Sequence, residues 1–275
     1  MSPCRGGRPR TCSRDRLRLT LSPLAVLRAA RSLWTRDRAI LLPLTGLFLF
    51  VPQWAILMLV PSAPAIPQGT PTQEVLAAWS QVFAAWLAAN APAYGIALLA
   101  TQFGGLAVTT LYIGRGAGQA GSAMRRAAAL IGRYLLAVLA LWSAPMLAVG
   151  MLAAAGGGVV AMIAVSAVTL VLLALTMLLG PAIAAERGGA LAGVAHSWRL
   201  TRGHRAGLFA LVAGVTVAVQ IVSGALLQLS TRLQVGGADN PVVLAVLNAG
   251  AAATLAAGAT TLALSGIIVY RALAR

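Results

Sequence analysis

The stretch of the sequence with the greatest variety of reactive side chains runs from residue 186 to 205 and reads ERGGALAGVAHSWRLTRGHR. Arg199, Arg202 and Arg205 recur every three residues, so a helix would carry them on one side. Trp198 stands directly before the first of them. Guanidinium groups can hold a lipid phosphate through paired N–H donors, so the spacing predicts a lipid- or phosphate-binding site at these four residues. The alternative is that the arginines only orient the chain and reach into the headgroup layer.

Enzymatic and metal chemistry is less well supported by this stretch. His196 and His204 are eight residues apart, which is not the spacing of a zinc site. Glu186 and His196 could act as acid and base in a lipid-modifying enzyme, but this pair lacks an orienting partner. We therefore expect no catalytic residue, no metal and no cofactor.

The composition indicates which elements must position these residues. Apolar residues make up 59% of the chain and charged residues 9%, whereas soluble domains are about 45–50% apolar and about 25% charged. Six uncharged runs reach the length of about 20 residues that a membrane-spanning helix needs. They comprise residues 39–60, 91–113, 134–153, 159–180, 206–229 and 242–270. The sequence thus predicts an all-α integral membrane protein, with a basic, disordered tail over residues 1–20 and one membrane domain over residues 21–275.

Positive charge predicts how these spans are oriented. All 21 basic residues are arginine, against 5 acidic residues. Six spans place the arginine clusters at 115–133 and 186–205 on the same side as both chain ends and leave only Arg232 on the other side. Because positive segments stay in the cytoplasm, we expect both termini there and the protein in the bacterial inner membrane. Nucleic-acid binding is not expected, since the arginines lie beside the apolar runs.

The uncharged residues between Glu74 and Arg115 could form two short spans or a single span. Two spans would move further arginines to the outside, so a single span is predicted. Residues 75–89 are then expected to form a helix at the outer interface, and a re-entrant segment is the alternative. Asn90 and Pro92 are expected to break this helix from the second span.

An arginine-bearing segment with helical periodicity precedes the first, third and fifth spans. Apolar residues recur in each at spacings of three and four, and arginines occupy the other face. The three sets are Arg28, Arg31 and Arg38; Arg125, Arg126 and Arg133; and Arg199, Arg202 and Arg205. This pattern is typical of basic interfacial helices in the headgroup plane, so anionic membrane lipids are the expected partners.

None of the six runs contains Asp, Glu, Lys, Arg or His, which disfavours a proton-coupled transporter. Gln102, Gln220 and Asn248 are the notable polar residues of the spans, and we expect hydrogen bonds between helices from them. Small residues crowd the last span and predict close helix packing. Pro145 could kink the third span and line a cavity. The alternative function is therefore a transporter or permease-like component for a neutral or lipidic substrate, acting near Pro145, Gln102 and Gln220.

A short motif at the start of the fifth span resembles a known family. Gly180 and Pro181 lie at the end of the fourth span, and AHSWRLTRG follows from Ala195 to Gly203. The chain resembles here the membrane domain found in glycerophosphoryl diester phosphodiesterases and in stand-alone bacterial membrane proteins. The positions that carry the motif are Pro181, Glu186, Ser197, Trp198, Arg199, Arg202 and Gly203. The resemblance implies a multi-pass helical domain, which in fused members precedes a soluble catalytic barrel.

The resemblance does not imply phosphodiesterase activity for these residues. The barrel of the fused members uses acidic residues, His and a divalent metal, and this sequence has only 5 acidic residues and 2 His. We expect a non-catalytic inner-membrane protein that organises lipids or membrane partners through its basic face. Other membrane proteins and further copies of the chain are candidate partners.

Overall fold

The computed structural model describes residues 22–65, 67, 72–113, 119–154, 158–185, 189–235 and 240–274, and these residues form helices and connections without a strand. Six helices are long and apolar enough to cross a membrane, which confirms the prediction of an all-α, six-span protein. The predicted tail over residues 1–20 lies outside the described residues.

The first span is built from three consecutive segments, namely α2 (Pro23–Thr45), the π-helical turn η1 (Gly46–Phe50) and α3 (Val51–Leu59). Pro52 follows the turn and has no backbone N–H to donate, so the regular hydrogen-bond ladder is interrupted there. The other spans are α4 (Gln73–Tyr112), α5 (Ala120–Ala154), α6 (Gly158–Ala185), α8 (Arg205–Val235) and α9 (Pro241–Leu273). A short helix, α7 (Ala190–Thr201), lies between α6 and α8.

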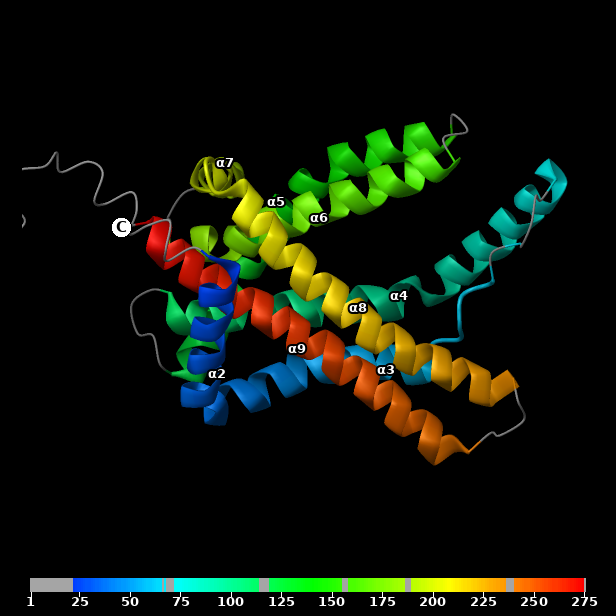
Figure 1. The fold of residues 1–275 in the computed structure, drawn as a ribbon, viewed down its shortest axis with the longest axis horizontal. Coiled ribbons are helices and arrows are strands. Elements are labelled where there is room, and N and C mark those ends of the chain that lie inside the picture. Colours follow the sequence, from blue (N-terminus) through cyan, green and yellow to red (C-terminus); the bar gives the residue numbers. More distant parts are fainter. Residues whose placement is uncertain are drawn as a thin grey trace, which may run out of the picture.

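The last helix, α9, is the centre of the bundle and packs against α2, α3, α4, α6 and α8 (Figure 1). Its small residues make these close approaches possible. A Cβ atom at Gly258 would lie 2.5 Å from Cγ2 of Val219 in α8, and one at Gly266 would collide with the backbone carbonyl of Met177 in α6. The predicted close packing of the last span is therefore confirmed.

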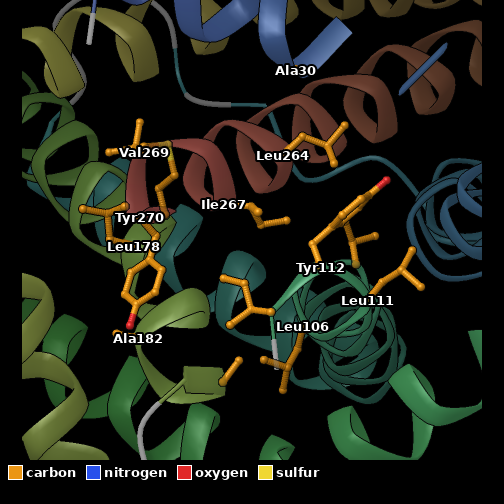
Figure 2. Close-up of a cluster of buried hydrophobic side chains, with 14 of the residues drawn as sticks. Ala30, Leu106, Leu111, Tyr112, Leu178, Ala182, Leu264, Ile267, Val269 and Tyr270 are labelled. Atoms are coloured by element: carbon orange, nitrogen blue, oxygen red, sulfur yellow. The ribbon is translucent and has the colours of Figure 1, made fainter. Parts of the chain in front are cut away.

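The largest buried cluster joins the six helices α2, α4, α5, α6, α8 and α9. Figure 2 shows Ala30 of α2, Leu106 of α4, Leu178 of α6 and Ile267 of α9 among its side chains, and each is at most 3% exposed. The outer part of α5 is different, because Leu147 there is 68% exposed. Exposed leucines on a spanning helix are expected, since lipid tails are as apolar as leucine.

The arginine-bearing segments share one end of the bundle. Figure 1 shows α7, the start of α2 and the C-terminal end of α9 at this end, whereas α4, α6 and α9 begin toward the opposite end. An even number of spans returns the chain to the end from which it started, so this arrangement agrees with the parity derived from the charges. We refer to the arginine-bearing end as the basic end.

The basic segments join their spans in different ways. In α2 the segment is set off by a kink at Asp37, whose φ of −108° and ψ of 17° are not helical. The second segment continues into its span within α5, because the first proline of that helix is Pro145. The third segment is the separate helix α7, with a turn before α8.

The course of α4 corrects one expectation. The predicted break at Asn90 and Pro92 is wrong, since α4 continues through both residues. The Asn90 side-chain amide donates to the carbonyl oxygen of Trp86 at 2.8 Å, and Pro92 removes only one backbone donor from a long helix. Before this point the rings of Trp79, Phe83 and Trp86 stack, with centroids 5.1 and 5.8 Å apart. Such an aromatic column suits a membrane–water interface, and this placement stays a prediction.

Candidate functional site

The predicted lipid site lies where α7 ends and α8 begins, over residues 198–205, which we call the α7–α8 corner. Arg202, Gly203 and His204 form the turn, and the backbone N–H of Arg202 donates to the carbonyl of Arg199 at 3.2 Å. Gly203 has a φ of +97°, a conformation that L side chains rarely adopt. The backbone conformation of the turn therefore explains why this position of the motif is a glycine.

One face of α7 is fixed against α6. The hydroxyl of Ser197, which is 3% exposed, donates to the backbone carbonyl of Leu175 at 3.0 Å. A Cβ atom at Gly193 would lie 2.8 Å from Cγ1 of Ile183, so the two helices touch there. Leu191, by contrast, is 72% exposed. The motif residue Ser197 thus anchors α7, and the corner is left facing outward.

The outward side of the corner carries the three predicted arginines and Trp198. The Arg205 guanidinium lies over the indole of Trp198, with its Cζ atom 4.6 Å from the ring centroid. A cation–π contact of this kind is worth about 0.5–1 kcal/mol at an exposed site. Arg199 and Arg202 are also exposed. Among the described residues, the side chains of these three arginines have neither an ion pair nor a hydrogen bond.

An apolar groove of about 290 Å³, which we call the corner groove, includes the Trp198–Arg205 pair in its lining. The lining consists of Val171, Ala174 and Leu175 from α6, Trp198 and Thr201 from α7, and Arg205, Ala206, Leu208 and Phe209 from α8. Arg205 is the charged residue of this lining. The groove thus combines apolar walls with a guanidinium, as a phospholipid with its acyl chain and its phosphate would require.

The histidines of the same region have separate surroundings. The ring of His196 lies 6.3 Å from the ring of Tyr270, centroid to centroid, whereas His204 lines a smaller cavity of about 170 Å³ between α2, α8 and α9. The part of the chain that the structure describes contains no group of three His, Cys, Asp or Glu residues that could hold a metal ion. Glu186, the suggested partner of His196 and a motif residue, lies outside the described residues.

Two arginines of α5, Arg126 and Arg133, bond to other parts of the protein. A terminal guanidinium nitrogen of Arg133 donates to the carbonyl oxygen of Ile183 at 2.6 Å, and one of Arg126 donates to that of Ala184 at 3.4 Å. Both acceptors lie in the last turn of α6, whose carbonyls have no partner within the helix. Cations at a helix C-terminus are also favoured by its dipole. The second basic segment therefore caps α6, a role that the sequence pattern did not reveal.

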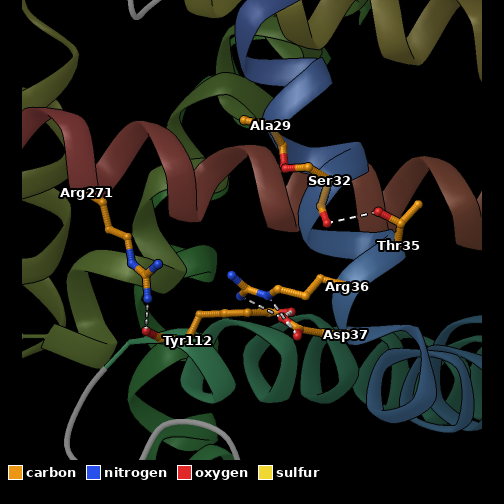
Figure 3. Close-up of polar contacts among 7 residues, drawn as sticks. All are labelled: Ala29, Ser32, Thr35, Arg36, Asp37, Tyr112 and Arg271. Carbon is orange, nitrogen blue, oxygen red and sulfur yellow. Dashed lines mark hydrogen bonds and ion pairs between the residues drawn. The ribbon is translucent and has the colours of Figure 1, made fainter.

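A further polar cluster at the basic end consists of Arg36, Asp37, Tyr112 and Arg271, and we call it the Asp37 clasp (Figure 3). The Asp37 carboxylate accepts two hydrogen bonds from Arg36, at 3.0 and 2.9 Å, and one from the Tyr112 hydroxyl at 2.7 Å. Arg271 donates to the backbone carbonyl of Tyr112 at 2.5 Å. The clasp ties the kink of α2 to the ends of α4 and α9. Asp37 could have been noticed as a single carboxylate among arginines at the start of an apolar run.

The residues of the transporter alternative are not brought together. Gln102 lines a cavity of about 800 Å³ between α4, α5, α6 and α9. Gln220 is exposed on α8, and neither Gln220 nor Pro145 belongs to the cavity lining. Asn248 does form the expected bond between helices, because its amide donates to the carbonyl of Leu57 at 3.3 Å and joins α9 to α3.

Comparison with known proteins provides no relative from which a function could be transferred, because no family model matches the chain and no curated protein or solved structure is similar to it. The resemblance of the Trp198 motif to the membrane domain of glycerophosphoryl diester phosphodiesterases stays a prediction. The function is therefore argued from the geometry of the corner.

Proposed function

We propose that this multi-pass membrane protein is a non-catalytic component of the bacterial inner membrane that binds anionic phospholipid at the α7–α8 corner. By holding lipid there, it organises the surrounding lipids or partner proteins. The basic end faces the cytoplasm in this proposal, because positive segments are retained on that side. In this proposal the chain belongs to the membrane-domain family that its motif resembles.

The observation that carries the proposal is the corner groove, whose lining includes the Trp198–Arg205 pair. Its apolar walls match an acyl chain, and its guanidinium matches a phosphate. Two further exposed arginines, Arg199 and Arg202, stand on the same corner without an acceptor among the described residues. An anionic headgroup is the acceptor that a membrane supplies at this depth.

The test is native mass spectrometry of the full chain released from mild detergent, after titration with phosphatidylglycerol or phosphatidylcholine. We expect the wild type to retain phosphatidylglycerol in preference to phosphatidylcholine. The variant Arg199→Gln, Arg202→Gln, Arg205→Gln should lose this preference, with a drop in affinity of about tenfold, since each lost charge near the surface is worth about 1 kcal/mol and not all three contact one lipid.

A second variant separates charge from geometry. Replacing the same three arginines by Lys keeps the charge but removes the planar fork that binds phosphate through two bonds. We expect this variant to fall between the wild type and the Gln variant. Equal retention of both lipids by the wild type, or unchanged retention by the Gln variant, would overturn the proposal.

A further inference from the structure

A second, larger cavity shares only α6 with the corner groove. It has a volume of about 800 Å³ and is lined by α4, α5, α6 and α9, with Leu49 of η1 at one side. The cavity is open at the surface of the bundle, where Leu98 and Leu139 of its lining are 57% and 64% exposed. On α4 its lining runs from Gly95 to Thr109, which is about 21 Å of helix at a rise of about 1.5 Å per residue. This length covers most of a hydrocarbon core of about 30 Å. The volume falls within the range of about 300–1,000 Å³ that is usual for ligand pockets.

The lining of this cavity is uncharged. It contains no Asp, Glu, Lys, Arg or His, and Tyr134, its one titratable residue, is neutral at pH 7. The walls are mainly leucine, glycine and other apolar residues from spanning helices. The corner groove has Arg205 in its lining, so the two sites differ in the charge that they can accept. An anionic headgroup would meet no positive partner in the larger cavity.

One neutral polar group of the lining is available to a ligand. The amide of Gln102 is partly exposed and has no hydrogen-bond partner among the described residues. The indole nitrogen of Trp142, another residue of the lining, is covered by protein atoms and does not face the hollow. A bound molecule with an uncharged oxygen would accept a hydrogen bond from the Gln102 amide.

Two adjacent glycines of α4 show that the hollow is open on the side of α5 and α6. A Cβ atom at Gly104 would lie 2.6 Å from Cβ of Phe48, so this glycine faces the packed side of α4. A Cβ atom at Gly105 would have no heavy atom within 4 Å, and the same holds for Gly95. Both Gly95 and Gly105 line the cavity. A side chain added at Gly105 would therefore enter the hollow without displacing a neighbour.

We propose that this cavity binds a neutral long-chain amphiphile, of the diacylglycerol type, whose alkyl chain lies along α4 and whose uncharged oxygen accepts a hydrogen bond from the Gln102 amide. The alkyl chain matches the apolar walls, and the neutral polar end matches the absence of charged side chains in the lining. A methylene group contributes about 0.8 kcal/mol when it leaves water. A lipid enters this cavity from the bilayer, so its alkyl chain gains nothing of this kind. Selectivity over bulk lipid therefore rests on the polar end. The site is independent of the anionic-lipid site at the corner.

The experiment uses the full chain reconstituted in phosphatidylcholine vesicles with a photoactivatable diacylglycerol that carries a diazirine in its acyl chain. We expect cross-links on half-buried cavity residues such as Leu173 and Leu262, and competition by unlabelled diacylglycerol but not by phosphatidylglycerol. Gly105→Leu should reduce this labelling at least about fivefold, because the added side chain occupies the cavity. Gly214→Leu is the matched control on α8, since a Cβ atom there also meets nothing within 4 Å and Gly214 does not line the cavity.

The polar end is tested with a second probe, a diazirine-bearing alkane of similar length. Gln102→Leu should weaken labelling by the diacylglycerol about fivefold, as expected for one lost hydrogen bond, and leave alkane labelling unchanged. Equal labelling of wild type and Gly105→Leu, or equal labelling by a diazirine-bearing phosphatidylglycerol, would overturn the proposal. The variant Arg199→Gln, Arg202→Gln, Arg205→Gln should be labelled by the diacylglycerol probe as strongly as the wild type.

Discussion

Arginines at the basic end of this protein fall into two groups, which differ in whether their side chains have an acceptor within the protein. Arg36 and Arg271 in the Asp37 clasp, and Arg126 and Arg133 in α5, donate to carboxylate or carbonyl oxygens of the chain itself. The arginines of the α7–α8 corner have no such acceptor among the described residues. In the first group, Arg126, Arg133 and Arg271 fix helices to one another, and Arg36 holds the Asp37 carboxylate of its own helix. The second group is available to a ligand.

This difference teaches that charge alone does not locate a lipid site. The three basic segments look alike in sequence, each with arginines opposite an apolar face. Arg126 and Arg133 of the second segment meet acceptors at the end of α6, whereas the corner arginines of the third segment meet none among the described residues. The comparison therefore predicts that variants of the first group lower stability and leave lipid binding unchanged. Variants of the second group should lower lipid binding and leave stability unchanged.

The largest expected effect on stability comes from Asp37→Ala. The change leaves the Tyr112 hydroxyl without its acceptor and frees the kink of α2 from the end of α4. Hydrogen bonds to charged groups contribute about 1.5–3 kcal/mol, so we expect a loss of about 2 kcal/mol, measured by thermal or denaturant unfolding in detergent. Glu74→Gln removes an exposed carboxylate from the opposite end and should change stability by less than about 0.5 kcal/mol. A loss from Asp37→Ala no larger than that of the control would mean that the clasp does not hold the helices.

A smaller loss is expected from Arg133→Met. Methionine keeps much of the apolar stem but removes the donor to the Ile183 carbonyl at the end of α6. We expect destabilisation of about 1–1.5 kcal/mol in the same unfolding measurement. Arg125→Met, at an exposed position in the same segment, is the control and should be close to neutral. Phosphatidylglycerol retention should be unaffected in both variants, and a clear loss of lipid in Arg133→Met would contradict the assignment of this arginine to capping.

The six spans could be predicted from sequence because bilayer thickness sets the length of an apolar run directly. The position of the corner could also be predicted, since Trp198, Arg202 and Gly203 lie in a short local motif. The Asp37–Tyr112 bond could not, because its partners are 75 residues apart and meet only through tertiary packing. The course of α4 was missed for a local reason, namely that Asn90 bonds back to the preceding turn and Pro92 is tolerated within a long helix.

At the corner, Trp198→Leu should lower lipid affinity without lowering stability. The leucine removes the ring over which Arg205 lies and takes away part of one groove wall. We expect binding of phosphatidylglycerol to weaken about fivefold, which corresponds to the loss of one cation–π contact of about 1 kcal/mol. Trp198→Phe keeps an aromatic face and should retain most of the affinity. Unchanged binding in Trp198→Leu would show that the groove wall has no part in lipid recognition.

The smallest effect is expected from the exposed arginines of α2. Arg28, Arg31 and Arg38 also lack an acceptor among the described residues, but none of them lines the corner groove. Replacing all three by Gln removes as much charge as the corner variant, yet it should reduce phosphatidylglycerol affinity only about twofold, as a screened surface contribution that disappears at high salt. If this variant loses as much lipid as the corner variant, charge alone accounts for retention. The groove and its Trp198–Arg205 pair would then not define a site, whereas a clear gap between the variants would assign the binding to the corner.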